Sequence, residues 1–189
     1  MVVRELWQEL SEAAFAPAGF EVGFGDGEGL PPIPIPGGGM NAVLRGFIDR
    51  VDIWDNGASR YYRVVDYKTG KKDFDYCDVF NGVGLQMLLY MFALKSSGSD
   101  MLGDRPVAAG VQYFPARAPY LTADGKLTAE EAEQERISQW KRKGLLLNDE
   151  AVLQAMEPGE APKRMCYSVK KDGTVSGSFI IELADNAKV

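Results

Sequence analysis

The fold is decided by residues 44–68, which read LRGFIDRVDIWDNGASRYYRVVDYK. Near the centre of this stretch stands Asp55-Asn56-Gly57, a strong turn signal between two runs of β-prone residues. We therefore predict a β-hairpin whose strands lie within residues 41–54 and 60–68. These two strands carry the acidic residues on which the functional interpretation depends.

The predicted hairpin brings together three charged side chains. Residues two apart on a strand point to the same face, so Asp66 and Lys68 project side by side. The first strand can add Asp49 to this patch. Carboxylates suit Mg²⁺ or Mn²⁺, and a lysine beside them can orient a metal-bound water or stabilise charge on a phosphate, so the trio is typical of a metal-dependent phosphodiesterase. The alternative is a salt-bridged pair on an ordinary edge strand.

Two acids on the first strand must be told apart, because strand alternation places Asp49 and Asp52 on opposite faces. Asp49 shares its face with apolar residues such as Phe47 and Val51, where a carboxylate is costly unless a bound cation compensates for its charge. Asp52 shares its face with Arg50. We therefore predict Asp49 as the metal ligand and Asp52 as a solvated or arginine-paired acid.

The composition is that of one globular domain with an acidic balance, since 46% of the 189 residues are hydrophobic and 25% are charged. The chain has no histidine, which excludes Ser-His-Asp and Cys-His catalysis and histidine-bound zinc. The net charge of −6 argues against a strong independent nucleic-acid binder, unless a partner supplies the basic track. No membrane-spanning run or signal peptide is present, so we expect a cytoplasmic protein with reduced thiols at Cys77 and Cys166.

The remaining sequence predicts helices and strands around the hairpin. In chain order these are a helix over 2–16, a strand over 20–24, a glycine- and proline-rich loop over 25–39, a helix over 81–95, a strand over 107–114, a helix over 129–143 that begins with a capping box at Thr128 and Glu131, and a short strand over 178–181. This order indicates an α/β fold with a mixed sheet flanked by helices. We expect a single domain over 1–189, with a motif core over 41–114 and a C-terminal extension over 120–189.

The helix predicted over 81–95 presents two polar side chains toward one side. Gln86 and Tyr90 lie one turn apart and therefore share a helical face. Both can donate hydrogen bonds to a phosphate or to a metal-binding carboxylate. Taken alone, such a pair is more often a polar contact at the edge of a core.

Three ordered motifs resemble those of a known family. They are Gly46-Phe47-Ile48-Asp49, the run VDYKTG over 65–70 and the run QMLLY over 86–90. This set resembles the PD-(D/E)XK nuclease superfamily in its RecB-like branch, and within that branch the C-terminal nuclease domain of AddB-type helicase-nuclease subunits. The likeness covers roughly residues 13–175. It implies a restriction-endonuclease-like mixed sheet flanked by helices.

The resemblance also implies a reaction and the residues that carry it. The implied reaction is exonuclease-type, Mg²⁺- or Mn²⁺-dependent hydrolysis of DNA, on a single strand that a helicase partner subunit delivers during double-strand-break end resection and recombinational repair. The roles carried over are Asp49 and Asp66 as metal ligands, Lys68 as the catalytic lysine, Gln86 and Tyr90 as support, and, as the weakest assignment, Glu21 as the acid that precedes the first motif strand.

Two departures from the family pattern concern metal sites. RecB-like nucleases usually have an upstream histidine at the metal site, and AddB-type domains carry four cysteines that hold an iron–sulfur cluster. This chain has no histidine, and neither Cys77 nor Cys166 has the cluster spacing. We therefore expect an excised piece of a longer subunit, with the iron–sulfur cluster in the parent subunit and lower activity in the piece alone. The alternatives are a non-catalytic nuclease-fold scaffold that clamps DNA, and a plain acidic interaction domain.

Overall fold

The computed structural model describes residues 2–25, 27, 29–35, 42–70, 72–118, 120–121, 125–177 and 180–181, and it divides the chain into two compact units. Unit 1 comprises Met1–Ala14, Tyr67–Phe74 and Gln112–Val189. Unit 2 comprises Phe15–Asp66 and Asp75–Val111. Over the described parts of both units, no helix has the length and apolarity needed to cross a membrane.

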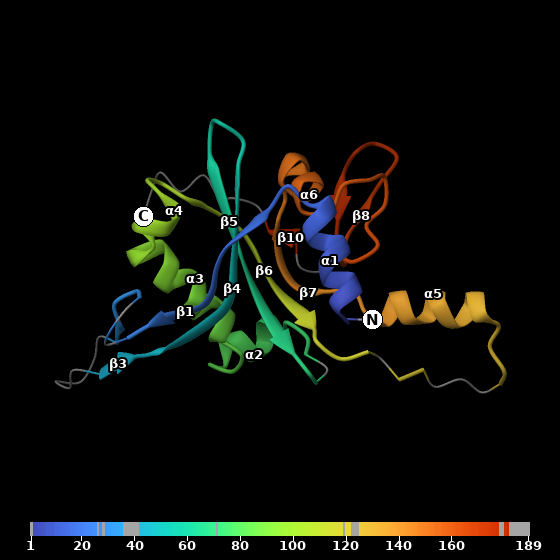
Figure 1. Ribbon diagram of the computed structural model, residues 1–189, viewed down its shortest axis with the longest axis horizontal. Helices are drawn as coiled ribbons and strands as arrows, with labels where there is room; N and C mark the ends of the chain where they lie inside the picture. Colours follow the sequence, from blue (N-terminus) through green and yellow to red (C-terminus); the bar gives the residue numbers. More distant parts are fainter. Residues whose placement is uncertain are drawn as a thin grey trace. The chain divides into compact units, whose positions relative to one another are not determined.

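Unit 2 is built on the predicted hairpin, drawn in teal in Figure 1. Strands β4 (Gly46–Asp55) and β5 (Arg60–Lys68) pair antiparallel, and the carboxylate of Asp55 accepts the Gly57 N–H at 2.8 Å in the turn. Strand β1 (Ala16–Phe24) pairs antiparallel with the other edge of β4. Strand β6 (Val107–Pro115) follows β5, so the strand order is β1-β4-β5-β6. The hairpin and the strand predicted over 107–114 are confirmed.

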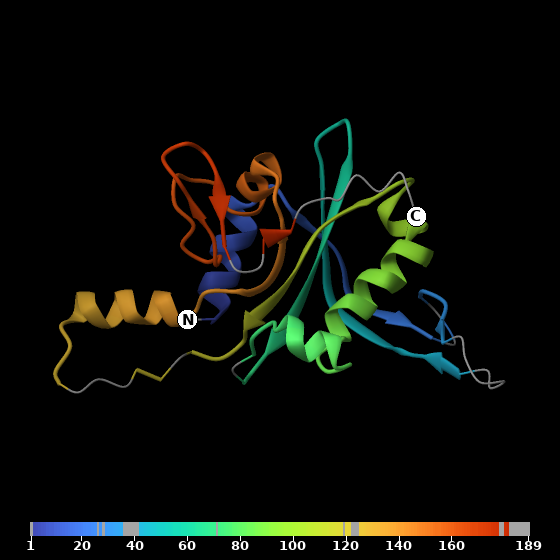
Figure 2. The same cartoon turned by 180° about the vertical axis from the view of Figure 1, so that it is seen from behind.

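Three helices accompany these strands, α2 (Tyr76–Phe80), α3 (Gln86–Ser97) and α4 (Ser99–Leu102). The single helix predicted over 81–95 is therefore wrong in its start. Gly82 and Gly84 have φ angles of 78° and 71°, a left-handed conformation that interrupts the helix between α2 and α3. Helix α3 lies beside β5 (Figure 2), and the Tyr62 hydroxyl on β5 donates to the Met91 carbonyl on α3 at 3.4 Å.

Part of the predicted loop over 25–39 forms a short strand. Strand β2 (Ile33–Ile35) pairs antiparallel with β3 (Ala42–Leu44), while residues 36–41 lie outside the described residues. The glycine and proline content of this stretch obscured a three-residue strand, which is too short to produce a pattern of alternation.

Unit 1 contains the helices and strands at both ends of the chain. They are α1 (Val2–Glu12), α5 (Ala129–Gln139), β7 (Lys143–Leu147), α6 (Glu150–Met156), β8 (Ser168–Val169), β9 (Val175–Ser176) and β10 (Ile180–Ile181). The end of β6 lies beside β7, and β10 pairs parallel with β7, so the sheet is mixed as predicted. Helix α1 ends beside α6, where the Ala14 N–H donates to the Ala155 carbonyl at 2.7 Å (Figure 1). The capping box of Thr128 and Glu131 is confirmed at the start of α5.

Further predicted bounds differ from those observed, and the strand predicted over 20–24 begins earlier, at Ala16, as β1. Helix α1 ends at Glu12, before the predicted end at 16, because strand β1 already begins at Ala16. Helix α5 ends at Gln139, before the predicted end at 143, because Lys143 is the first residue of β7. Of the strand predicted over 178–181, residues 178–179 lie outside the described residues, and 180–181 form β10.

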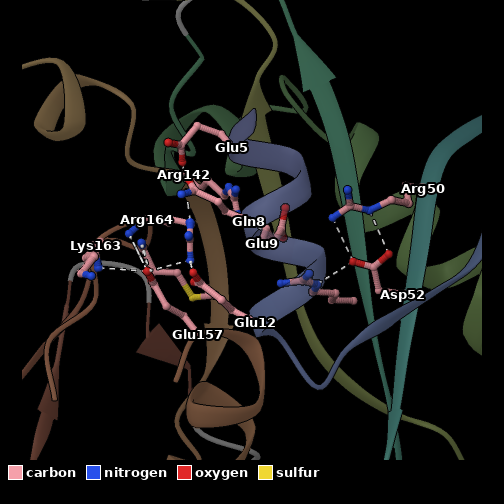
Figure 3. A network of polar contacts seen from close by, with 12 residues as sticks. Glu5, Gln8, Glu9, Glu12, Arg50, Asp52, Arg142, Glu157, Lys163 and Arg164 are labelled. Atoms are coloured by element: carbon pink, nitrogen blue, oxygen red, sulfur yellow. Dashed lines mark hydrogen bonds and ion pairs between the residues drawn. The ribbon is translucent and has the colours of Figure 1, made fainter. Parts of the chain in front are cut away.

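A fully buried charge cluster crosses the β4–β5 hairpin of unit 2. Asp52 binds Arg50 at 2.8 Å and Arg63 at 2.8 Å, and all three side chains are 0% exposed (Figure 3). The Arg63 guanidinium also lies over the Phe15 ring, 5.2 Å from its centroid. The predicted arginine pairing of Asp52 is therefore confirmed, but the alternative of a solvated acid is wrong. The hairpin register places Arg63 directly opposite Asp52.

Unit 1 is held by ion pairs of its own (Figure 3). The Glu9 carboxylate on α1 binds the Arg142 guanidinium at 2.8 Å, and both side chains are almost fully buried. The Glu157 carboxylate, 5% exposed, accepts the backbone N–H groups of Lys163, Arg164 and Met165. The one buried residue of α1 among those described is the arginine-bound Glu9.

Candidate active site

The two predicted metal ligands lie on adjacent strands of unit 2. In the β4–β5 ladder, Arg50 pairs with Val65, and the same register continued by one residue would set Asp49 opposite Asp66. Side chains directly opposite each other in a ladder share one face of the sheet. Asp66 is 1% exposed and Asp49 is half-buried. The hairpin thus brings two carboxylates to one face at one level, as strand alternation predicts.

The pKa of the Tyr90 hydroxyl responds to the charges of both carboxylates. Burial raises the pKa of the Tyr90 hydroxyl above its ordinary value, and the negative charges of Asp66 and Asp49 raise it further, while the hydrogen bond from Gln86 opposes the shift. A carboxylate disfavours tyrosinate only when it lies nearby, so this shift is the one expected if both aspartates lie near the Tyr90 hydroxyl. The grouping of Asp49, Asp66, Gln86 and Tyr90 into one site stays a prediction.

Gln86 and Tyr90 interact on α3 as their spacing predicts. The Gln86 side-chain amide donates to the Tyr90 hydroxyl oxygen at 2.5 Å. Because a tyrosine hydroxyl has one proton to donate, accepting from Gln86 directs that proton elsewhere. Tyr90 is 6% exposed, whereas Gln86 is exposed. The tyrosine is thus a fixed hydrogen-bond donor beside two carboxylates, and Gln86 orients it.

Two further residues hold Tyr90 in place, and sequence reasoning missed their role. The Phe24 ring on β1 contacts the Tyr90 ring edge to face, with centroids 5.9 Å apart. Phe24 pairs with Gly46 on β4, and a Cβ at Gly46 would lie 2.8 Å from the Phe24 ring. A glycine within a strand often marks such a close approach. This glycine, quoted above only as part of a motif, was the available signal.

Lys68 is the last residue of β5, two positions after Asp66, and strand alternation gives the two side chains the same face. The Lys68 side chain is half-buried, and its carbonyl accepts the Ala116 N–H at 2.9 Å within unit 1. That bond continues the strand pairing beyond the end of β6. The backbone that carries the Lys68 ammonium is therefore hydrogen-bonded at Lys68 itself, the last residue of β5.

The assignment of Glu21 as the acid that precedes the first motif strand stays a prediction. Glu21 lies in β1 with a φ angle of 47°, between the ladder pairs Phe20–Arg50 and Val22–Ile48, and its side chain is exposed. Within the described ranges, no group of three or more His, Cys, Asp or Glu side chains is placed to hold a metal ion.

The donor set of Asp49 and Asp66 fits a divalent cation. Mg²⁺ prefers carboxylate oxygens, retains several waters and is commonly bound by one or two protein carboxylates. A carboxylate as buried as Asp66 is also costly to desolvate, and a cation would compensate for its charge. Both thiols of the chain are free, with Cys77 exposed and Cys166 half-buried. The iron–sulfur cluster expected for a parent subunit stays a prediction.

Comparison with known proteins identifies the family of the chain. Residues 1–166 match the sequence pattern of the PD-(D/E)XK nuclease superfamily. The chain is similar to proteins named as subunits of an ATP-dependent helicase/deoxyribonuclease, with 41% identity over 178 residues in Clostridium novyi, 36% over 181 in Acetivibrio thermocellus and 35% over 179 in Clostridium acetobutylicum. These alignments cover 92%, 93% and 93% of this chain but only 16% of each relative. The chain therefore spans about one-sixth of the length of these relatives.

Proposed function

The chain belongs to the PD-(D/E)XK nuclease superfamily, and we propose that it hydrolyses the phosphodiester bonds of DNA with Mg²⁺ or Mn²⁺ bound by Asp49 and Asp66. The observation that carries this proposal is the β4–β5 register, which, continued by one residue beyond the Arg50–Val65 pair, would set Asp49 opposite Asp66 on one face of the sheet. The raised pKa of the nearby Tyr90 hydroxyl supports it. A scaffold would gain nothing from gathering like charges at a half-buried place, since each raises the cost of the other.

The side chains of the site divide the work of hydrolysis. When bound, the divalent cation supplies Lewis acidity, which polarises the phosphate and lowers the pKa of a bound water. Asp49 and Asp66 would hold the cation, and the Tyr90 hydroxyl would donate a hydrogen bond to one of these carboxylates and so fix its orientation. Lys68 would stabilise the negative charge that develops on the phosphate oxygens. In the hydrolysis, the water gives up one proton as its oxygen bonds to phosphorus, the bond from phosphorus to the leaving sugar oxygen breaks, and that oxygen takes up one proton from solvent, so that no net proton is gained or lost.

The names of the relatives support a more specific role. They are helicase/deoxyribonuclease subunits, and this chain corresponds to a small part of each. We infer that it is the nuclease portion of such a subunit, that a helicase partner supplies a single DNA strand, and that cleavage is exonucleolytic. The setting would be end resection at double-strand breaks and recombinational repair.

A cleavage assay tests the proposal. The 189-residue chain is incubated with an end-labelled single strand and either Mg²⁺ or Mn²⁺, alongside the variants Asp66→Asn and Lys68→Ala. We expect each variant to lose at least about 100-fold in cleavage rate, the usual loss for one electrostatic group in an active site. Asp55→Asn, which alters an exposed carboxylate at the hairpin turn, is the matched control and should cleave like the wild type.

A second readout does not depend on activity. Electron paramagnetic resonance of Mn²⁺ should show binding to the wild type and to Asp55→Asn, and strongly weakened binding to Asp66→Asn. Cleavage retained in both Asp66→Asn and Lys68→Ala would refute the proposed mechanism. DNA binding by the wild type with no cleavage in either metal would favour the scaffold interpretation instead.

A further inference from the structure

Unit 1 contains a cavity of about 630 Å³, and Lys68 is one of the residues that line it. Its lining is strongly basic, since it includes five cationic side chains and one carboxylate. These are Lys68, Lys72, Arg117, Lys141 and Lys143, with Asp73 as the carboxylate. The chain as a whole has a net charge of −6, so this concentration of positive charge runs against its overall balance.

The one carboxylate of the lining offsets little of this positive charge. The Lys143 ammonium lies 3.6 Å from the Asp73 carboxylate, and both side chains remain nearly half exposed, so the pair is screened by solvent. Lys72 and Arg117 are exposed, and Lys141 is half-buried. The lining therefore presents a net positive surface to whatever enters the cavity, which indicates an anionic ligand.

An aromatic platform lies at the same cavity. The Arg117 guanidinium covers the Tyr120 ring at 4.6 Å from its centroid, and Tyr120 is 77% exposed. A guanidinium stacked on an exposed tyrosine is a flat surface of the kind on which unpaired bases stack. Positive charge alone would suit any anion, but positive charge beside a stacking surface favours nucleotides.

The local structure holds these groups in place. The Trp140 indole N–H at the end of α5 donates to the Pro115 carbonyl at the end of β6, at 2.7 Å. This bond joins two parts of the cavity wall that are 25 residues apart in the sequence, one next to Lys141 and the other next to Arg117. The cavity is thus a built feature of unit 1.

We propose that this cavity is a nucleotide-binding subsite, in which Lys72, Arg117 and Lys141 bind backbone phosphates and Tyr120 stacks an unpaired base of the strand whose scissile phosphate lies at Lys68. The inference rests on the proposed function, because Lys68 belongs both to the proposed catalytic set and to the cavity lining. A cavity of this volume accommodates a ligand of about two nucleotides, not a duplex.

Fluorescence anisotropy tests the subsite without cleavage. A labelled oligothymidylate of about ten nucleotides, within the usual range of single-strand site sizes, is titrated with the whole chain in EDTA at several salt concentrations. The variant Lys72→Ala/Lys141→Ala should bind more weakly, and its slope of log affinity against log salt should be shallower by about 1.4, since each single-strand phosphate contact contributes about 0.7. Lys95→Ala/Lys170→Ala removes two exposed lysines outside the cavity and should match the wild type.

Tyr120 gives an independent arm of the test. Tyr120→Ala should weaken binding at least about fivefold, whereas Tyr120→Phe should bind like the wild type, because stacking needs the ring and not the hydroxyl. Polyglutamate of equal charge should compete poorly with the oligonucleotide, and so should a duplex of the same length. Equal competition by either would overturn the nucleotide assignment, as would an unchanged salt slope in Lys72→Ala/Lys141→Ala.

The two proposals fail in different ways. If the wild type binds through these lysines in EDTA but never cleaves with Mg²⁺ or Mn²⁺, the subsite stands and the proposed function fails. If it cleaves, and the lysine and Tyr120→Ala variants bind as tightly as the wild type, the function stands and the subsite is refuted. Circular dichroism of each variant confirms folding, which we expect to be unchanged because Lys72 and Tyr120 are exposed.

Discussion

Removing the charge of Asp52 should destabilise the protein strongly, although Asp52 takes no part in the proposed chemistry. The Asp52 carboxylate receives a two-pronged interaction from Arg50, at 2.8 and 3.0 Å, and a third contact from Arg63 at 2.8 Å. None of the three side chains has any solvent exposure. Asp52→Asn keeps the size of the side chain but removes the negative charge that both buried guanidinium groups contact.

The magnitude follows from the completeness of this burial. Breaking a buried pair by removing one partner costs about 3–5 kcal/mol, because the remaining charge stays desolvated. With a urea dependence of about 2 kcal/mol per molar, such a loss moves the unfolding midpoint down by about 1.5–2.5 M. A natural domain has a total stability of only about 5–15 kcal/mol, so this is a large fraction of the whole.

The assay is urea denaturation followed by circular dichroism and tryptophan fluorescence, at neutral pH. Asp55→Asn in the same hairpin is the matched control. Asp55 binds Arg60 at 3.2 Å, but both side chains are substantially exposed, so solvent screens the pair and its loss should barely move the midpoint.

Equal midpoints for Asp52→Asn and Asp55→Asn would refute this reasoning, because it would show that the cluster is hydrated or replaceable. A loss of the proposed DNA cleavage should accompany the loss of stability. Asp52 lies on β4 three residues after Asp49, and Arg63 lies on β5 three residues before Asp66. The cluster therefore stabilises the register that places the two proposed ligands opposite each other.

Three further outcomes are expected. Burial raises the pKa of Tyr62 to about 12, so the unfolded chain loses this proton near pH 10 while the folded chain retains it. The free energy of unfolding should therefore fall as the pH rises from about 10 to 12. Tyr62→Phe should flatten that part of the plot of urea midpoint against pH. Glu157→Gln weakens the acceptor of three backbone N–H groups and should cost about 1.5–3 kcal/mol of stability. This loss should lower the thermal unfolding midpoint by about 3–10 °C. Glu160→Gln, which changes an exposed carboxylate, should match the wild type. Burial raises the pKa of the Cys166 thiol, so in a Cys77→Ser background its alkylation should accelerate only at higher pH than in urea-unfolded protein, and identical pH profiles would contradict this.

Local sequence signals predicted the hairpin and the α5 capping box, because each depends on residues only a few positions apart. The turn at Asp55-Asn56-Gly57 and the Thr128–Glu131 pair form the hydrogen bonds that their spacing suggests. Helix α2 was not predicted, and the helix predicted over 81–95 began five residues before α3. Gly82 and Gly84 have a left-handed conformation there, although the apolar spacing alone favours a helix.

The site was predictable to the extent that it depends on strand alternation. One hairpin register relates Asp49 to Asp66, and Gln86 meets Tyr90 because one helical turn separates them. The Phe24–Gly46 contact that positions Tyr90 involves three separate elements, so no local pattern contains it.

By itself, then, the sequence determined the hairpin, the faces of its strands and the order of the motifs, since these follow from backbone periodicity over short distances. Only the tertiary structure decided that Asp52 is buried between two arginines, because the counter-charge from Arg63 depends on strand register. It also decided that Lys72, Arg117 and Lys141 line one cavity. These residues are far apart in the chain, and only the folding of unit 1 gathers their charges around a common space.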